Sequence, residues 1–307
     1  MSAGPKPVLI PRKAISPQAL EIRNVLFTTD FGASSQAALP YACAIARRYG
    51  AKMHVLHVIP PEPRLAVPID RYPAELDTAR QDATEQMEGL LSQDVLKGLP
   101  QCALVERGTI ADVIPTVIQR EDADLVVVGT RGHRGLKKLM LGSVAEQIFR
   151  LATCPVITIG PETVRDDVAP GEFPKILFAA DFSPACVRAL PWALSLAKED
   201  RSRLTMLHVI EEISDAGLEY LEGVTQACKQ RLTELLPAGA GEWCRPEFLV
   251  EVGPAADMIL KVAQEEQANL IVMGARRRGA MAASHLPWAT AYAVACHAVC
   301  PVLTVRE

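Results

Sequence analysis

The sequence predicts two α/β domains of the same kind in tandem, each built on a mostly parallel sheet, and three observations support this. The chain has 307 residues, enough for two domains of ordinary size. Residues 24–59 align without a gap on 175–210, and residues 105–132 align on 250–277. Within each repeat, short β-branched runs alternate with helical patterns, which is the order expected of parallel strands joined by helices.

The first repeat is expected to contain five strands and four helices in alternation. The strands are expected at residues 24–29, 52–59, 102–106, 124–129 and 155–159. The helices are expected at residues 34–48, 74–97, 110–121 and 143–152. Apolar runs such as DLVVVG lack the alternation of a half-exposed sheet, so they indicate strands that helices cover on both faces.

The repeat also indicates the domain boundaries. We predict a first domain at residues 21–160 and a second at 173–307, after an N-terminal extension at 1–20. The segment PETVRDDVAPGE (161–172) between them contains prolines, a glycine and charged residues, which suit an exposed linker.

Composition narrows the classes of partner. The formal net charge is -4, so the chain lacks the basic excess that draws proteins to nucleic acid or to an anionic membrane surface. No apolar run reaches the roughly 18 residues of a membrane span, and the N-terminus lacks a secretory signal pattern, so we expect a cytoplasmic protein. The eight cysteines form no CxxC pair, which favours reduced thiols, and Cys296, His297 and Cys300 do not have a recurrent zinc-site spacing, so no metal is expected.

A glycine-rich segment follows the fourth strand, at the sheet edge where parallel α/β sheets bind ligands. GTRGHRGLKKLMLGSV (129–144) separates Gly129, Gly132 and Gly142 by two and nine residues, and Ser143 follows the third glycine. Glycine lets backbone N–H groups approach a ligand closely, and a helix that begins near Gly142 carries partial positive charge at its first turn. The spacing therefore predicts a phosphate site.

Two features near this loop have competing interpretations. The loop holds a cluster of basic residues, Arg131, His133, Arg134, Lys137 and Lys138. Such a cluster either assists phosphate binding or is simply solvated, and the glycine loop itself could connect strand and helix without binding phosphate. Asp30, after the first strand, is either a ligand-binding residue or a cap for the following helix.

Together these features resemble the universal stress protein family, whose nucleotide-binding members carry Gly-x2-Gly-x9-Gly-Ser/Thr at this place. The resemblance also rests on the segments LFTTDF (26–31), LHVI (56–59) and CPVITI (154–159), and it covers both repeats. It implies two Rossmann-like domains of the adenine nucleotide alpha hydrolase-like type.

The resemblance further implies that the first domain binds ATP, with or without Mg²⁺. Asp30 and Val58 would hold the adenine and ribose end, and the glycine loop would hold the ribose and phosphates. The expected cofactor-binding residues are Thr28, Asp30, Val58, Gly129, Arg131, Gly132, Gly142, Ser143 and Val144.

The second repeat departs from the glycine pattern. The residues at the three glycine positions and at the serine position are Gly274, Arg277, Pro287 and Trp288. Proline has no N–H to donate, and tryptophan is too bulky for close approach of a phosphate, so we expect no phosphate site there. Asp181 and Val209 are retained at the positions of Asp30 and Val58, so the second repeat could still bind an adenine-sized or other ligand.

The leading interpretation is a stress-response protein in which ATP binding to the first domain changes a surface that an unidentified protein partner reads. A homodimer of the whole chain is compatible with the sequence. His57 and His208 are expected to be packed in strands rather than catalytic, and no catalytic residue is identified. The alternatives are a slow ATP hydrolase or self-phosphorylating protein, and a nucleotide-independent scaffold or chaperone-like module.

Overall fold

The structure is a computed structural model that describes residues 20–61, 72–130, 141–160, 163, 167–211, 220–275 and 287–306. The chain divides into two compact units, each described by itself below. The first unit comprises residues 21–171 and 295–301, and the second comprises residues 172–294 and 302–307 together with the residues up to 20. None of the helices in the described residues combines the length and the apolar character that a membrane span requires.

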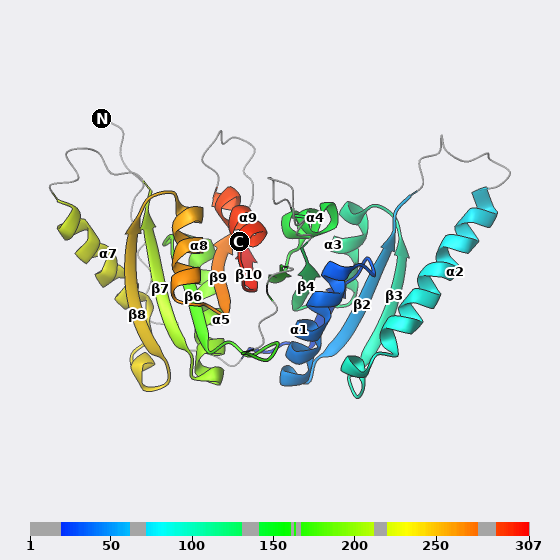
Figure 1. Cartoon of the computed structure of the whole chain (residues 1–307), viewed down its shortest axis with the longest axis horizontal. Helices are drawn as coiled ribbons and strands as arrows, with labels where there is room; N and C mark the ends of the chain where they lie inside the picture. The colour runs from blue at the N-terminus through cyan, green and yellow to red at the C-terminus, as the bar shows by residue number, and fades with distance from the viewer. Residues whose placement is uncertain are drawn as a thin grey trace. The chain divides into compact units, whose positions relative to one another are not determined.

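The first unit alternates strands and helices in the expected order (Figure 1). Its elements are β1 (Asn24–Thr28), α1 (Ala33–Tyr49), β2 (Lys52–Ile59), α2 (Tyr72–Leu91), the short 3-10 helix η1 (Asp94–Leu96), β3 (Gln101–Arg107), α3 (Ile110–Arg120), β4 (Leu125–Gly129), α4 (Ser143–Leu151) and β5 (Val156–Ile159). The helix expected over 74–97 ends at Leu91, because the Ser92 hydroxyl donates to the Gly89 carbonyl and the chain then tightens into η1.

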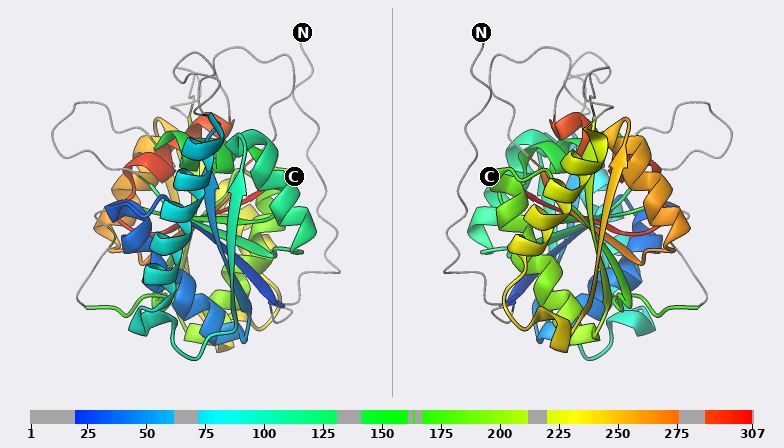
Figure 2. Two further views of the ribbon diagram at one scale, coloured as in Figure 1. Left: turned by 90° about the vertical axis from the view of Figure 1, so that its right-hand side faces the viewer. Right: turned by 90° about the vertical axis from the view of Figure 1, so that its left-hand side faces the viewer.

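All the strands of the first unit are parallel, in the order β3-β2-β1-β4-β5. Helices α1 and α2 lie on one face of this sheet, and α3 and α4 lie on the other (Figure 2). Val25, Leu26 and Phe27 of β1 are completely buried, as expected for a strand covered on both faces. The strand order reverses between β1 and β4, which is where sheets of this type open a crevice at their carboxyl ends.

The second unit repeats this architecture. Its elements are β6 (Lys175–Ala179), α5 (Pro184–Asp200), β7 (Arg203–Ile210), α7 (Leu221–Leu235), the 3-10 helix η2 (Ala240–Glu242), β8 (Arg245–Val252), α8 (Ala255–Glu265), β9 (Leu270–Ala275), α9 (Pro287–His297) and β10 (Val302–Arg306). The strands are again all parallel, in the order β8-β7-β6-β9-β10. The predicted α/β fold, with helices on both faces of a parallel sheet, is therefore confirmed in both repeats.

Candidate functional site

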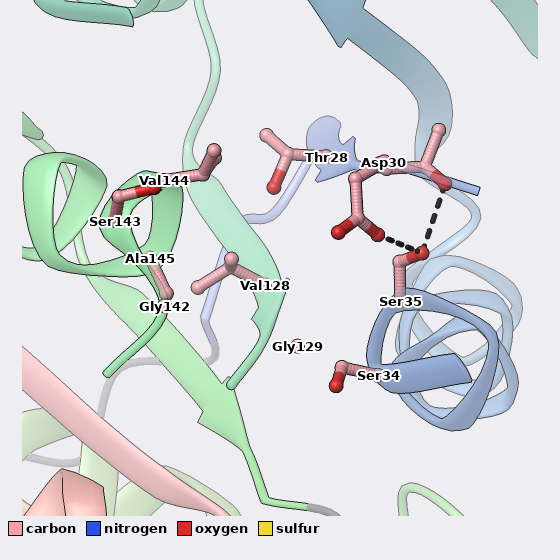
Figure 3. Close-up of a pocket in the computed structure, with 11 residues that line it drawn as sticks. Thr28, Asp30, Ser34, Ser35, Val128, Gly129, Gly142, Ser143, Val144 and Ala145 are labelled. Atoms are coloured by element: carbon pink, nitrogen blue, oxygen red, sulfur yellow. Dashed lines mark hydrogen bonds between the residues drawn. The ribbon is translucent and has the colours of Figure 1, made fainter. Parts of the chain in front are cut away.

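A pocket opens in the first unit at the point where β1 and β4 separate. It is bounded by the ends of these two strands and by the first turns of α1 and α4 (Figure 3). Its lining residues are Thr28, Thr29, Asp30, Ser34, Ser35, Val128, Gly129, Gly142, Ser143, Val144 and Ala145. The pocket thus joins residues that are more than 100 positions apart in the chain, and it lies at the predicted edge of the sheet.

The turn between β1 and α1 is held by a hydrogen-bonded cluster around Ser35. Ser35 is buried, and its hydroxyl lies 2.9 Å from Asp30 Oδ1, 2.9 Å from the Gly32 carbonyl and 3.1 Å from Thr29 Oγ1. Asp30 Oδ1 also accepts from the Gly32 N–H at 2.9 Å, and Thr29 Oγ1 accepts from the Phe31 N–H at 2.9 Å. These bonds fix the orientation of the exposed Asp30 carboxylate at the mouth of the pocket.

Asp30 therefore acts in the turn that precedes α1. Gly32 is the N-cap residue and supplies no side-chain cap, and the Asp30 carboxylate accepts its N–H instead. Asp30 is thus not the N-cap of α1, which was the structural alternative expected from the sequence; its carboxylate orders the turn that precedes the helix. This role is compatible with ligand binding, because a carboxylate has several acceptor positions.

The same turn contains an aromatic pair that recurs in the second unit. Phe31 has a positive φ of 58°, and its ring lies 4.4 Å from that of His57. His57 Nδ1 is 2.9 Å from the Thr29 carbonyl, so Nδ1 carries the proton and donates it. The equivalent His208 Nδ1 donates to the Ala180 carbonyl at 2.7 Å, and burial is the main cause that lowers the pKa of His208. Both histidines thus anchor their turns through a ring nitrogen.

Gly129 has a packing role that the spacing of the glycines did not indicate. A Cβ atom at Gly129 would lie 2.1 Å from the carbonyl oxygen of Ser34, so the first turn of α1 could not pack against the end of β4. Gly274 occupies the same place in the second unit, where a Cβ atom would lie 2.5 Å from the backbone of Ala185 and Cys186. Close packing of helix on strand therefore explains why both repeats have glycine here.

Helix α4 directs its N-terminus at the pocket. Its N-cap is Gly142, which forms no side-chain cap, and Ser143 and Val144 follow in the first turn. The first N–H groups of a helix have no acceptor within the helix, and the helix dipole makes this end favourable for an anion. The end of α4 can therefore receive a phosphate without displacing a capping side chain.

Thr28, the last residue of β1, has a buried hydroxyl without a partner. The residue is 5% exposed, and no hydrogen-bond partner for Oγ1 occurs among the residues that the structure describes. Buried hydroxyls in proteins are normally satisfied, so an orphaned one in the wall of a pocket indicates that a ligand atom or a water molecule completes it.

The structure brings together most, but not all, of the predicted site. Thr28, Asp30, Gly129, Gly142, Ser143 and Val144 all line the pocket. Val58 is half-buried near the end of β2 and is not among the described residues that line it. Arg131 and Gly132, with the rest of the basic cluster, lie outside the described residues.

Five lining residues were not among the expected site residues: the apolar Val128 and Ala145, and the hydroxyl-bearing Thr29, Ser34 and Ser35. The three hydroxyl-bearing residues are the ones that add polar groups to the pocket. They belong to no spacing motif, but comparison of the two repeats could have identified them. The residues equivalent to Thr28, Thr29, Ser34 and Ser35 in the second repeat are Ala179, Ala180, Ala185 and Cys186. The aspartate, the phenylalanine and the histidine of the turn are retained in both repeats, so the hydroxyl groups at these four positions distinguish the first.

The second unit lacks these hydroxyls and also differs in its last helix. Helix α9 begins at Pro287, the counterpart of Gly142, and proline has no N–H to offer a ligand there. The Asp181 carboxylate accepts from the Ser183 N–H at 2.9 Å, so this aspartate retains the turn-forming role. Within the described residues of either unit, no cluster of three or more metal-binding side chains occurs.

Comparison with known proteins identifies the family. The family model described as the universal stress protein family matches residues 21–160 and 172–306. The chain belongs to the universal stress protein family. A universal stress protein of Mycolicibacterium smegmatis is 25% identical over 292 residues, which is 92% of this chain and 97% of the relative. A universal stress protein of Methanocaldococcus jannaschii is 25% identical over 138 residues, 45% of this chain and 81% of the relative.

Solved structures share the fold. A universal stress protein from Archaeoglobus fulgidus covers 94% of this chain with a TM-score of 0.68 and 24% sequence identity, and 99% of that structure is matched. A structure from Pseudomonas aeruginosa covers 93% of this chain with a TM-score of 0.62 and 21% identity. The relative from Mycolicibacterium smegmatis and these two structures match along both repeats, so this universal stress protein is similar over nearly its whole length to proteins of comparable size.

Proposed function

We propose that the first unit binds ATP in the pocket between β1 and β4, and that nucleotide occupancy, rather than turnover, is the function of the protein. The observation that carries the proposal is the convergence of an uncapped helix N-terminus and an orphaned buried hydroxyl on one pocket. An anion and a hydrogen-bonding group on the same ligand would satisfy both, and a nucleotide has both.

The expected roles of the site residues follow from their positions. The phosphates would lie against the first turn of α4, where Gly142, Ser143 and Val144 offer backbone N–H groups and a hydroxyl. Asp30, held by Ser35, would accept a hydrogen bond from the sugar or base. The remaining expected contacts are Val58, Gly129, Arg131 and Gly132. Mg²⁺ would accompany the phosphates in solution, since the described part of the chain offers no cluster of metal ligands.

Binding is proposed in preference to hydrolysis because the one carboxylate in the described lining of the pocket, Asp30, is assigned to the sugar or base of the ligand and not to its phosphates. Occupancy would be read by a protein partner in the cytoplasm, and the domain boundaries of this proposal are those expected from the repeat, at 21–160 and 173–307. A homodimer of the whole chain is also proposed.

Isothermal titration calorimetry of the full chain with ATP tests the proposal. We expect a stoichiometry near one per chain, because the second unit lacks both the hydroxyls and the glycine loop. A Gly142→Val variant should bind more weakly, since a branched side chain would occupy space beside the phosphates. Absence of ATP binding by the wild type would contradict the proposal, and a stoichiometry near two would contradict the assignment to the first unit. A mass increase of the protein after incubation with ATP would favour self-phosphorylation instead.

A further inference from the structure

Among the described residues that line the pocket, Thr28 is the one whose side chain is buried and has a hydrogen-bonding group without a partner. Its hydroxyl is enclosed at the end of β1, and Figure 3 shows the oxygen pointing into the space between the first turn of α4 and Asp30. The neighbouring Thr29 is also buried, but its hydroxyl contacts both the Phe31 N–H and the Ser35 hydroxyl. Of the two threonines, Thr29 therefore has hydrogen-bond partners within the described protein, and Thr28 has none.

A valine would suit the place of Thr28 in the ligand-free protein better than threonine does. Valine has the same shape and a higher preference for strands, and it carries no hydroxyl to leave unsatisfied. At the equivalent position the second unit has Ala179, which is also buried and has no polar side chain. The hydroxyl is thus present in the first unit, whose pocket it lines, and absent at the equivalent position of the second, which indicates a role toward the ligand.

We propose that the Thr28 hydroxyl hydrogen-bonds an uncharged polar group on the nucleoside part of the ligand and makes this pocket selective for a nucleotide over a bare phosphate chain. This inference rests on the proposed function. Thr28 lies between the end of α4, which suits the phosphates, and Asp30, so it faces the middle of a ligand that spans both. A hydroxyl both donates and accepts, which matches the hydroxyls of a sugar or the nitrogens of a base.

Calorimetry on the full chain with ATP, adenosine and inorganic triphosphate tests this inference. Thr28→Val should weaken the binding of ATP and of adenosine by about 5- to 30-fold each, because a ligand group loses its partner in a buried site. Binding of inorganic triphosphate should be unchanged. Thr28→Ser keeps the hydroxyl and should retain the affinity for ATP within about twofold.

Thermal unfolding without ligand gives a second readout that a structural role would move differently. Ligand-free Thr28→Val should unfold at the same temperature as the wild type or at a higher one. The matched control is Thr130→Val, because the buried Thr130 hydroxyl donates to the Ile159 carbonyl at 3.3 Å and its loss should lower the unfolding temperature.

Three results would overturn the inference. They are wild-type affinity of Thr28→Val for ATP and adenosine, an equal loss of affinity for triphosphate, and a lower unfolding temperature of ligand-free Thr28→Val. If the wild type binds neither ATP nor adenosine, the proposed function fails as well. Binding of ATP by the wild type with no effect of Thr28→Val refutes the role of Thr28 alone.

Discussion

The two units have the same backbone turn after their first strands, but they present different chemistry there. The first unit has four hydroxyl-bearing residues where the second has three alanines and a cysteine. Both units nevertheless keep an aspartate that accepts from the following turn, a phenylalanine with positive φ and a histidine that donates to the strand carbonyl. The shared residues give both units the same turn, and the hydroxyl groups at these four positions of the first unit make its pocket more polar.

A residue that recurs in both repeats can serve either the fold or the ligand, and the difference between the two units helps to tell these roles apart. Asp30 and Gly129 are both expected from the sequence to bind the ligand. Each also has a role in the turn or in packing that its second-unit counterpart repeats. Recurrence in a repeat that lacks the binding loop therefore indicates a role in the fold.

The largest effect is expected for the glycine that both units use to pack helix on strand. Gly129→Ala and Gly274→Ala should each lower the free energy of unfolding of their own unit by about 3 kcal/mol or more, because the added methyl would overlap the backbone of α1 or α5. Denaturant unfolding followed by circular dichroism measures both. The control pair is Gly89→Ala in α2 and Gly223→Ala in α7, where an added Cβ meets nothing within 4 Å and helix propensity should raise stability slightly. If Gly129→Ala were as stable as the wild type, the packing role assigned to this glycine would be wrong.

The next effect distinguishes the two aspartates. Asp30→Ala should weaken ATP binding by about 10- to 100-fold, since it removes a charged acceptor at the pocket. Asp181→Ala should leave the ATP affinity nearly unchanged. Both variants lose a turn-forming acceptor, so each should lose about 1 kcal/mol of stability, and this shared loss cancels when the affinities are compared. If calorimetry gave a stoichiometry near two that Asp181→Ala reduced to one, the second unit would be a binding site after all.

A smaller effect is expected when the first unit receives the second unit's residue. Ser35→Cys replaces the hydroxyl that contacts Asp30 Oδ1 with a thiol, which is a weak hydrogen-bond donor. The Asp30 carboxylate should then be less well oriented, and the affinity for ATP should fall by about 3- to 10-fold. Cys186→Ser in the second unit is the matched variant and should not change the affinity. If Ser35→Cys bound ATP as tightly as the wild type, the hydrogen-bonded cluster around Ser35 would have a role in the fold and none in ligand binding.

The smallest effect concerns pH and the histidine of the second unit. Burial lowers the pKa of His208, so the unfolded chain binds a proton more readily than the folded one. The neutral His208 ring costs the folded protein no stability above about pH 6.5, the pKa of histidine in the unfolded chain. As the pH falls from there toward the lower pKa of the folded state, the free energy of unfolding decreases. His208→Gln should make the unfolding free energy less dependent on pH between 7.5 and 5.5.

Burial is also the main cause that lowers the pKa of His54 in the first unit, so His54 adds to the pH dependence of unfolding in both proteins. The difference between the pH profiles of the wild type and His208→Gln therefore reports on His208 alone. The expected difference is below about 1 kcal/mol. Identical pH profiles for the two proteins would exclude His208 as a source of the pH dependence. ATP binding should be the same in both, since the ring serves the turn of the second unit.

The fold was predictable from the sequence because two independent signals agree. Unbroken β-branched runs such as that of β4 identify strands buried on both faces, and the repeat doubles each of these observations. The end of α2 was less predictable, because the helical pattern continues past Leu91 while the Ser92 hydroxyl competes for the backbone.

The site was only partly predictable, for a physical reason. Spacing identifies residues that share a motif along the chain, as Gly142 and Ser143 do, and the repeat can point to residues such as Ser35 that form no motif. What a side chain contacts depends on the folded turn: that Ser35 bonds to Asp30, or that Thr28 has no partner, appears only when α1 and α4 are both in place. The close approach of the two backbones at Gly129 could not be predicted from the sequence either, because a glycine at this position is equally consistent with a phosphate-binding loop.

That close approach has a consequence for how the first unit opens. Because Gly129 brings the backbone of β4 directly against the first turn of α1, neither element can separate from the sheet without exposing the other. Amide hydrogens at the end of β4 and at the start of α1 should therefore exchange with solvent in one cooperative event, at one common free energy. A ligand that bridges β1 and α4 would slow that event for both elements together, so hydrogen exchange would detect occupancy of the pocket even at amides that the ligand does not touch.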